Sequence, residues 1–213
     1  ANVDQALIVM SAKAPDFSCT LVDRILFLIV NASIKPVLCI TKMDLVHPDD
    51  PVHGWIEDYR QSGYEVVLSG REELDENLAG VLRGKVTVLT GQSGVGKSSL
   101  LNKLNPEFQL QTQEISKALG RGKHTTRHVE LHEVAGGWVA DTPGFSSLDF
   151  SRMTPTELAQ SVPDFAPYLG RCRFRDCIHQ NEPGCAIKQA VEDRQVSRIR
   201  YADYLDCLTL VQG

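Results

Sequence analysis

The sequence lacks any apolar run long enough to cross a membrane. Its longest candidate, Ile25–Val30, is bounded by Arg24 and Asn31 and is far shorter than the roughly 20 residues that a spanning helix needs. A secretory signal is missing as well, because Ala1–Asp4 has no basic start and no apolar block follows it. Internal repeats and low-complexity segments are also absent. These absences exclude a membrane-spanning class, and we expect a cytoplasmic protein.

Positive charge is in short supply. The net charge of −5 excludes a protein that coats nucleic acid by charge alone. The basic residues are unevenly distributed, however, because residues 171–200 hold seven Arg or Lys against four acidic residues. The seven are Arg171, Arg173, Arg175, Lys188, Arg194, Arg198 and Arg200. This segment is either an ordinary solvated helix face or a surface that contacts RNA phosphates.

The pattern of apolar residues predicts an α/β fold. Apolar runs of strand length alternate with segments in which apolar residues recur at helical spacing. Because each of these runs is apolar throughout, we expect a mostly parallel sheet with helices on both faces. The expected strands are 5–11, 36–41, 65–69 and 85–90, and the expected helices lie near 21–29, 52–62 and 71–82.

The composition of the sequence changes after Leu104. Residues 105–127 are polar, rich in Gly and Lys, and show no sustained periodicity. A loop of this length inside a compact domain is usually functional or disordered. Two strands, about 128–134 and 137–141, should follow as a hairpin joined by Gly136-Gly137.

A phosphate-binding loop stands at residues 91–98, where every fixed position of G-x-x-x-x-G-K-[ST] is matched. The loop follows an apolar strand and precedes a helix starting near Lys97, so its backbone N–H groups can cradle phosphates at a positive helix end. We expect Lys97 to reach the β- and γ-phosphates and the Ser98 hydroxyl to ligate Mg²⁺. The candidate phosphate-binding residues are Gly91, Gln92, Ser93, Gly94, Val95, Gly96, Lys97, Ser98 and Ser99.

Two further segments predict that the nucleotide is a guanine nucleotide. Thr41-Lys42-Met43-Asp44 ends a predicted strand and fits [NT]-K-x-D, although Asn is commoner than Thr at its first position. The Asp44 carboxylate can accept two hydrogen bonds from guanine, and adenine would leave it unpaired, which argues against an ATP-using kinase. The Lys42 stem should pack on the base. Ser69 and Gly70, after the next strand, would bring a backbone N–H near guanine O6.

Residues 141–144 fit D-x-x-G, again at a strand end. Asp141 should hold Mg²⁺ through water, and the Gly144 N–H should contact the γ-phosphate. These motifs share the carboxyl ends of predicted parallel strands, where ligands bind in open α/β sheets. The base-reading motifs precede the phosphate loop, which reverses the usual order in GTPases. The sequence therefore predicts a circularly permuted GTPase.

A cysteine-rich segment follows at the C-terminal end. Cys172, Cys177, His179 and Cys185 give C-x4-C-x-H-x5-C, a ligand set that favours a closed, structural zinc site over disulfides. The other three cysteines lie in apolar contexts and should be buried: Cys19, Cys39 and Cys207. Proline becomes more frequent from Thr154 on, and a closing helix is expected from about Ala186 to Leu210. We therefore expect a GTPase domain over 1–152 and a small, mainly helical zinc-binding domain over 153–213.

Taken together, these segments resemble one family, the ribosome small-subunit-dependent, circularly permuted GTPases called RsgA or YjeQ. The resemblance covers nearly the whole chain. It implies a slow GTPase that uses Mg²⁺, carries zinc, is stimulated by the 30S subunit and its 16S rRNA, and acts late in small-subunit maturation. We expect a monomer. The RNA-binding OB-fold that precedes the GTPase domain in this family has no expected counterpart here. The matching segments are Gly91–Leu101, Gly122–Thr126, Asp141–Phe145, Cys172–Cys185 and Ser18–Arg24.

The resemblance also bears on catalysis. Many GTPases place a water-orienting Gln after D-x-x-G, but this chain has Phe145 there. The resemblance assigns that role to His124, although an exposed loop histidine without a role is the alternative. Either Thr125 or Thr126 should close over Mg²⁺ and the γ-phosphate, and Thr126 is favoured. A different class stays open, a nucleotide-gated rRNA-binding scaffold in which hydrolysis is incidental.

Overall fold

The computed structural model describes residues 3–71, 76–105, 131–141 and 148–212. Its contacts divide the chain into two compact units. The sheet unit comprises Ala1–Phe17, Ile34–Arg60 and Tyr64–Ser146, and the helical unit comprises Ser18–Ser33, Gln61–Gly63 and Ser147–Gly213. No helix in the described ranges is long and apolar enough to cross a bilayer.

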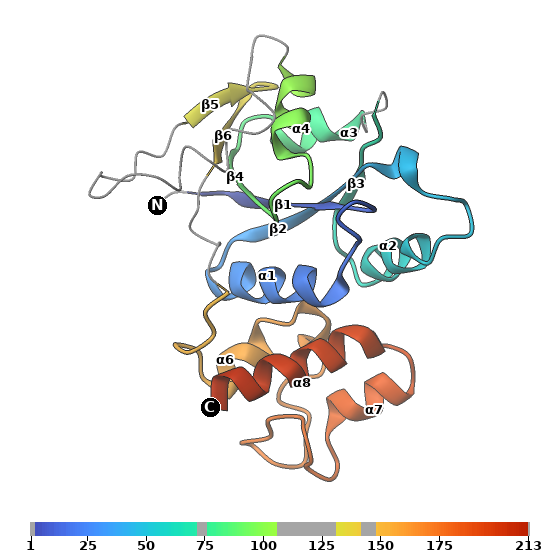
Figure 1. Ribbon diagram of the computed structural model, residues 1–213. Helices are drawn as coiled ribbons and strands as arrows, with labels where there is room; N and C mark the ends of the chain where they lie inside the picture. Colours follow the sequence, from blue (N-terminus) through green and yellow to red (C-terminus); the bar gives the residue numbers. More distant parts are fainter. Residues whose placement is uncertain (1–2, 72–75, 106–130, 142–147, 213) are drawn as a thin grey trace. The chain divides into compact units, whose positions relative to one another are not determined.

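The sheet unit is built on one sheet with the strand order β3-β2-β1-β4-β6-β5 (Figure 1). All neighbouring strands pair in parallel except β5, which runs antiparallel to β6 at the edge. All seven residues of β1 are buried, as the continuous apolar run predicts for an inner strand. The strands are β1 (Gln5–Ser11), β2 (Lys35–Thr41), β3 (Val66–Leu68), β4 (Val86–Thr90), β5 (Leu131–Val134) and β6 (Gly137–Asp141).

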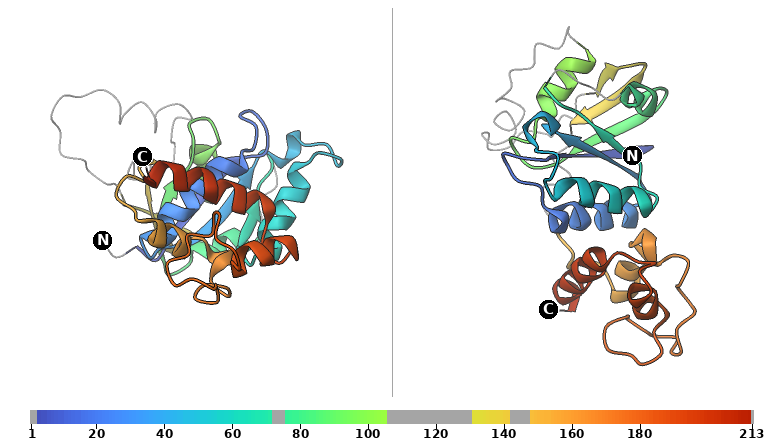
Figure 2. Two further views of the ribbon diagram at one scale, coloured as in Figure 1. Left: turned by 90° about the horizontal axis from the view of Figure 1, so that it is seen from below. Right: turned by 90° about the vertical axis from the view of Figure 1, so that its right-hand side faces the viewer.

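Helices cover both faces of this sheet, which confirms the expected α/β class. Helices α3 (Asn77–Leu82) and α4 (Lys97–Leu104) lie on one face, and α2 (Val52–Gln61) lies on the other (Figures 1 and 2). On the first face, buried side chains of the strands form one apolar core with those of the two helices, including Leu78 and Leu101. A short 3₁₀ turn, η1 (Met43–Leu45), follows β2.

The hairpin of β5 and β6 differs from the predicted one at its turn. The residues with positive φ are Ala135 and Gly136, at 53° and 75°, whereas Gly137 is already the first residue of β6. A Cβ on Gly137 would lie 2.0 Å from the carbonyl oxygen of Leu82, so close approach of two backbones explains this glycine. The strand β5 is described from Leu131 on.

The helical unit gathers five elements from distant parts of the sequence. They are α1 (Cys19–Asn31), α6 (Pro155–Gln160), η3 (Pro163–Phe165), α7 (Ala186–Glu192) and α8 (Arg198–Gln212). Helix α8 packs against α1 and α6. Thr20 in α1 donates a hydrogen bond to the Asp203 carboxylate of α8 at 2.7 Å. The contacts therefore group α1 with the C-terminal elements, whereas the sequence predicted one GTPase domain over 1–152.

The single closing helix expected over residues 186–210 is wrong, because the structure has two helices. Helix α7 ends at Glu192, and Arg194 takes a left-handed conformation with φ of 59°. The N–H groups of Gln195 and Val196 both donate to the Ala190 carbonyl, which turns the chain. Ser197 then accepts a hydrogen bond from the Arg200 N–H, and α8 begins.

Candidate nucleotide site and metal centre

The loop between β4 and α4 has the geometry of a phosphate cradle. Gly91, Gly94 and Gly96 have φ angles of 142°, 81° and 96°, which side-chain-bearing residues rarely adopt. A Cβ on Gly91 would lie 2.0 Å from the carbonyl oxygen of Val9, so glycine is required there. Lys97, the first residue of α4, donates to the Gly91 and Gln92 carbonyls at 2.7 and 2.8 Å. Its ammonium group therefore lies over the loop.

The predicted guanine-binding segment is attached directly to this loop. The buried Thr41 hydroxyl lies 2.5 Å from the Val95 carbonyl and 3.2 Å from the Met10 carbonyl, and it can donate to either. The Lys42 ammonium donates to the carbonyls of Gly94, at 2.7 Å, and of Ala14. Two side chains of the predicted guanine-binding segment therefore position the phosphate loop, a role that the sequence motif alone does not predict.

The second guanine-binding segment meets the first one. The Met43 N–H donates to the Ser69 carbonyl at 3.2 Å, and the position of a Cβ on Gly70 would lie 3.5 Å from Asp44 Oδ1. Lys103 of α4 donates to the Gly70 carbonyl. The Asp44 side chain is exposed. The structure thus gathers the two predicted guanine-binding segments and the phosphate loop at the carboxyl ends of β2, β3 and β4.

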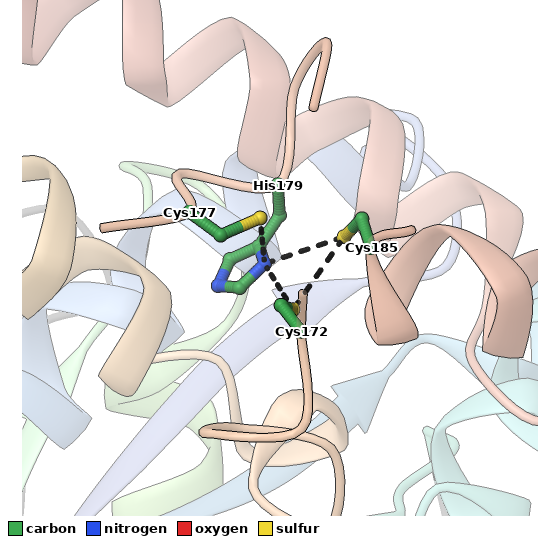
Figure 3. Close-up of side chains that lie close together, drawn as sticks. All are labelled: Cys172, Cys177, His179 and Cys185. Carbon is green, nitrogen blue, oxygen red and sulfur yellow. Dashed lines mark hydrogen bonds between the residues drawn. The ribbon is translucent and has the colours of Figure 1, made fainter. Parts of the chain in front are cut away.

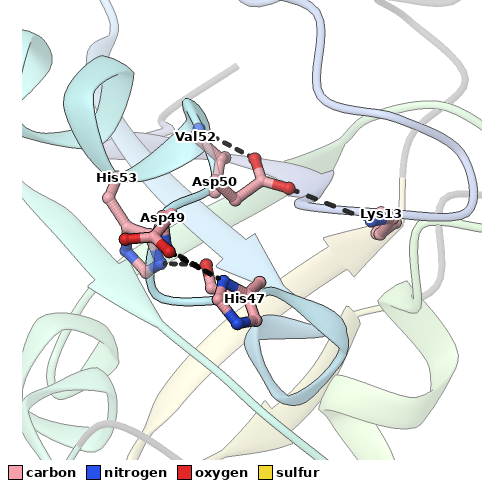
Figure 4. A network of polar contacts seen from close by, with 6 residues as sticks. All are labelled: Lys13, His47, Asp49, Asp50, Val52 and His53. Carbon is pink, nitrogen blue, oxygen red and sulfur yellow. Dashed lines mark hydrogen bonds and ion pairs between the residues drawn. The ribbon is translucent and has the colours of Figure 1, made fainter.

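A polar network on the sheet unit involves residues 47–53, which follow the predicted guanine-binding segment in the chain (Figure 4). Asp50 accepts the Val52 N–H at 3.0 Å at the start of α2 and lies 3.9 Å from the Lys13 ammonium. His53 Nε2 lies 3.2 Å from the His47 carbonyl. Ion pairs as exposed as Lys13–Asp50 contribute less than about 1 kcal/mol, so the network supports the loops without dominating their energetics.

Several predicted site residues fall outside the described part of the chain: His124, Thr125, Thr126 and Gly144. For Asp141 the structure gives the backbone alone, as the last residue of β6. Ser98, the last position of the motif, and Ser99 lie in the first turn of α4. The catalytic and magnesium assignments therefore remain predictions.

The four predicted zinc ligands converge in the helical unit (Figure 3). His179 Nδ1 lies 3.5, 3.4 and 3.4 Å from the Sγ atoms of Cys172, Cys177 and Cys185. The Cys172 and Cys185 sulfurs are 3.9 Å apart. A tetrahedral zinc ion with Zn–S bonds of about 2.3 Å requires sulfurs roughly 3.8 Å apart, so this ligand set fits zinc. The coordinating histidine nitrogen would be Nδ1.

The surroundings of the four ligands orient them. Glu182 accepts hydrogen bonds from the N–H groups of Ile178, Gln180 and Asn181 at 2.8 to 3.1 Å. Burial alone would raise the pKa of Glu182, but these N–H groups outweigh burial and lower it. The candidate ligand His179 has a φ of 60°. The hydrogen bonds from its neighbours Ile178 and Gln180 to Glu182, which we call the Glu182 brace, hold this conformation in place.

Helix α8 braces the same loop from the other side. The Tyr204 hydroxyl donates to the Ile178 carbonyl at 2.6 Å, and the Tyr201 hydroxyl donates to the His179 carbonyl at 2.8 Å. The Glu182 carboxylate thus binds backbone N–H groups of the ligand-bearing loop, and the two tyrosine hydroxyls bind its carbonyl groups. Hydrogen bonds of this kind orient the ligands of metal sites.

Protonation of the ligands follows from their burial. Burial lowers the pKa of His179, which favours the neutral imidazole that can bind a metal ion. Burial raises the pKa of the Cys177 thiol to about 12 and also raises that of Cys185. Because zinc binds thiolates, metal binding at this site must release protons.

The remaining predicted residues are only partly as expected. Cys39 and Cys207 are buried, but Cys19 is half-exposed at the start of α1, so the expectation of burial is wrong for it. Arg200 is fully buried next to Asp164 and cannot belong to a basic surface. Lys188 is half-buried. The other arginines of the basic segment are exposed: Arg171, Arg173, Arg175, Arg194 and Arg198.

Comparison with known proteins identifies the family. The family description "RsgA GTPase" matches residues 1–151, well over half of the chain. The chain belongs to the RsgA GTPase family. This is a family of GTP-hydrolysing enzymes, and the match confirms the resemblance inferred from the motifs.

Individual members of the RsgA GTPase family align along almost the full chain. "Small ribosomal subunit biogenesis GTPase RsgA" of Bacillus subtilis (strain 168) is 50% identical, and the match covers 99% of this chain and 72% of that protein. Its namesake from Bacillus pumilus is 51% identical, with coverage of 100% and 73%.

Solved structures confirm the fold as a circularly permuted GTPase. A crystal structure of YloQ, described as a circularly permuted GTPase, superimposes with a TM-score of 0.81 at 43% identity, covering 99% of this chain and 69% of that one. YjeQ from Thermotoga maritima gives a TM-score of 0.86 at 35% identity, with coverage of 100% and 73%. The permutation predicted from the motif order is therefore confirmed.

Proposed function

We propose that this GTPase assists late maturation of the 30S ribosomal subunit in the cytoplasm, where the subunit and its 16S rRNA stimulate GTP hydrolysis. Membership of the RsgA GTPase family supports this function, as do the names of relatives about 50% identical to the chain. The observation that carries the proposal is the physical union of the two motifs, in which Thr41 and Lys42 hold the phosphate loop at Val95 and Gly94. The segment that recognises the base and the loop that binds the phosphates of a nucleotide are then joined by hydrogen bonds.

The proposed roles in nucleotide binding follow from the residues at this junction. Asp44 accepts from guanine, and Ser69 and Gly70 line the base next to it. This role is supported by the position of Gly70, where an added Cβ would lie 3.5 Å from the Asp44 carboxylate. The backbone of the phosphate loop and the Lys97 ammonium bind the phosphates. With Mg²⁺ bound, Ser98, Thr126 and Asp141 would hold the ion, and the Gly144 N–H would contact the γ-phosphate.

Hydrolysis requires an oriented water molecule and stabilisation of the charge that develops on the phosphates. Lys97 supplies charge stabilisation, and His124 orients the water in place of the glutamine that many GTPases carry. Phe145 stands in that glutamine's position and has no hydrogen-bonding side-chain group. Docking on the 30S subunit places His124 and Thr126 correctly, which explains stimulation by the subunit.

Zinc has a structural role in this proposal. The four ligands would fill the coordination sphere of a zinc ion and leave no position for a substrate. The ion stabilises the segment that carries the exposed arginines, and these contact rRNA phosphates. The protein acts as a monomer.

The test is turnover of GTP with and without 30S subunits, at saturating nucleotide. We expect slow turnover by the free protein and a large increase with subunits. His124→Ala should remove most of the increase while GTP affinity stays nearly the same, because the loss falls on the transition state. His132→Ala, at a histidine in β5, is the matched control. Tight GTP binding without any stimulation by 30S subunits would instead favour the scaffold function.

A further inference from the structure

The segment that contains the first candidate zinc ligand and ends just before the second forms an exposed loop with an unusual side-chain set. We name residues 171–176 the arginine loop, with the sequence Arg-Cys-Arg-Phe-Arg-Asp. All of its side chains are exposed except Cys172, which is half-buried. Phe174 is 42% exposed, although a phenyl ring gains free energy by leaving water.

We propose that the arginine loop binds unpaired RNA and that Phe174 stacks on a nucleobase. The proposal rests on the proposed ribosomal function and names the chemistry of one of its RNA contacts. It predicts that an aromatic ring at position 174, and not charge alone, contributes to RNA affinity.

The charge of the loop is complementary to RNA. Three arginines surround Phe174, and Asp176 is the one acidic residue of the loop. This concentration stands out because the whole chain carries a net charge of −5. Guanidinium groups bind phosphate oxygens in a bidentate manner, so the arginines can hold the backbone on either side of a base on Phe174.

The ring of Phe174 is already part of a stack. The guanidinium carbon of Arg173 lies over the ring, 5.5 Å from its centroid, within the range of a cation–π interaction. A guanidinium occupies one face of a phenyl ring, and a base on the opposite face would extend the stack. Arginine and aromatic side chains are the groups on which proteins stack splayed-out bases.

The loop is held at both ends before any RNA binds. Cys172 and Cys177 belong to the cluster of candidate zinc ligands, so a bound zinc ion would fix both ends of the segment between them. The Arg173 N–H donates to the Gly184 carbonyl at 3.0 Å. Gly184 has a φ of 72°, and a Cβ there would lie 3.1 Å from Arg173 Cβ. A loop fixed in this way loses little conformational entropy on binding.

These observations favour unpaired RNA over a duplex. Bases in an A-form duplex are stacked on one another, and their faces are closed to a phenyl ring. Arginines contacting phosphates would bind duplex and single strand alike, whereas a stacking ring adds affinity for the single strand only. A protein partner would require a wider apolar surface than the loop offers, because Phe174 is its one exposed apolar side chain.

The experiment measures affinity for a short fluorescein-labelled single-stranded RNA that does not pair with itself, and for the same RNA in a full duplex. The proteins are the 213-residue chain with zinc and its Phe174→Ala and Phe174→Trp variants. Zinc content must be equal in all three. Leu210→Ala, at an exposed apolar residue of α8, is the matched control.

We expect Phe174→Ala to weaken single-strand binding roughly 5- to 150-fold, the range of base–aromatic stacking, and to leave duplex binding unchanged. Phe174→Trp should retain affinity, and its added indole should lose fluorescence when the single strand binds. Leu210→Ala should behave as the unchanged chain does.

Three results would overturn the proposal: no single-strand binding by the unchanged chain, equal affinity with Phe174→Ala, or an equal loss on the duplex. Loss of binding to 30S subunits by Phe174→Ala with unchanged RNA affinity would overturn it as well and would indicate a ribosomal protein as the partner. Stimulation of GTP turnover by 30S subunits is measured on the unchanged chain separately. Its absence would refute the ribosomal function, whereas the RNA titration by itself decides the role of Phe174.

Discussion

The guanidinium of Arg200 lies 2.9 Å from the carboxylate of Asp164, and the two side chains are only 1% and 3% exposed. The same guanidinium donates to the Ser62 hydroxyl at 3.1 Å. Arg200 thereby joins α8 to η3 and to Ser62, which lies in the segment Gln61–Gly63 of the same helical unit. Arg200, although it belongs to the basic segment of the sequence, therefore forms a buried ion pair inside the helical unit.

Removing one member of this pair should destabilise the helical unit. Asp164→Asn leaves the buried guanidinium without its counter-charge, and an uncompensated buried charge costs about 3–5 kcal/mol. Chemical denaturation followed by circular dichroism measures the loss. Arg198→Met, two residues before Arg200 and exposed, is the control and should change stability by less than about 0.5 kcal/mol. Equal stability of Asp164→Asn and the unchanged chain would refute the structural role of the pair.

Zinc should depend on Cys177 and should be separable from nucleotide binding. Cys177→Ser removes one of four ligands, so the protein should lose zinc and the order of the segment around residues 172–185. Nucleotide affinity should persist, because the residues that form the phosphate loop belong to the sheet unit. Elemental analysis and a nucleotide titration measure the two effects. Cys19→Ser, outside the cluster, should keep its zinc, and a zinc-free preparation of the unchanged chain made without chelator would contradict the assignment.

Glu182 should matter for zinc although it is not a ligand. Glu182→Gln keeps the shape of the side chain but removes the charge that receives three backbone N–H groups. Zinc affinity should fall about 10- to 100-fold, as is typical for residues that orient metal ligands. Competition with a chromogenic chelator measures this affinity. Glu192→Gln, at an exposed residue ending α7, is the control. If both variants bind zinc equally well, the brace has no energetic role.

Local patterns predicted much of the structure, because they carry their own physical cause. The run at 5–11 is apolar from Ala6 to Met10, and the structure has the inner strand β1 with the predicted bounds. The phosphate loop could be predicted because its backbone needs glycine at fixed positions, where the φ angle is one that other residues rarely adopt. Gly91, with a φ of 142°, is an example. The zinc ligands were readable for the same reason, since a closed tetrahedral set imposes its own spacing.

What the sequence did not reveal depends on contacts between distant residues. The break between α7 and α8 contains neither Gly nor Pro, and the chain turns there through two hydrogen bonds to Ala190. Thr20 and Asp203 are 183 positions apart, so no local pattern shows that α1 belongs with α8. The burial of Arg200 was missed because its partner Asp164 lies in another element.

Guanine selectivity should rest on Asp44. Asp44→Asn replaces two acceptor positions by an amide, so GTP should bind more weakly by a few kcal/mol and xanthosine triphosphate should gain affinity. Titration with fluorescent analogues of both nucleotides measures the change. Asp49→Asn is the matched control, because Asp49 follows in the same loop and its side chain is 93% exposed. Unchanged GTP affinity in Asp44→Asn would mean that another residue reads the base.

Thr41 should couple base recognition to phosphate binding. Its hydroxyl is buried and lies 2.5 Å from the Val95 carbonyl, inside the phosphate loop. Thr41→Val keeps the size of the side chain but removes the donor, and the loss of one such hydrogen bond should weaken both GTP and GDP about three- to tenfold. Thr41→Ser retains the hydroxyl and should bind as the unchanged chain does. A direct contact with the base alone would predict a different result, in which inorganic triphosphate binds equally well to Thr41→Val and the unchanged chain. Weakened triphosphate binding in Thr41→Val, measured by competition, would therefore establish that this threonine acts through the loop.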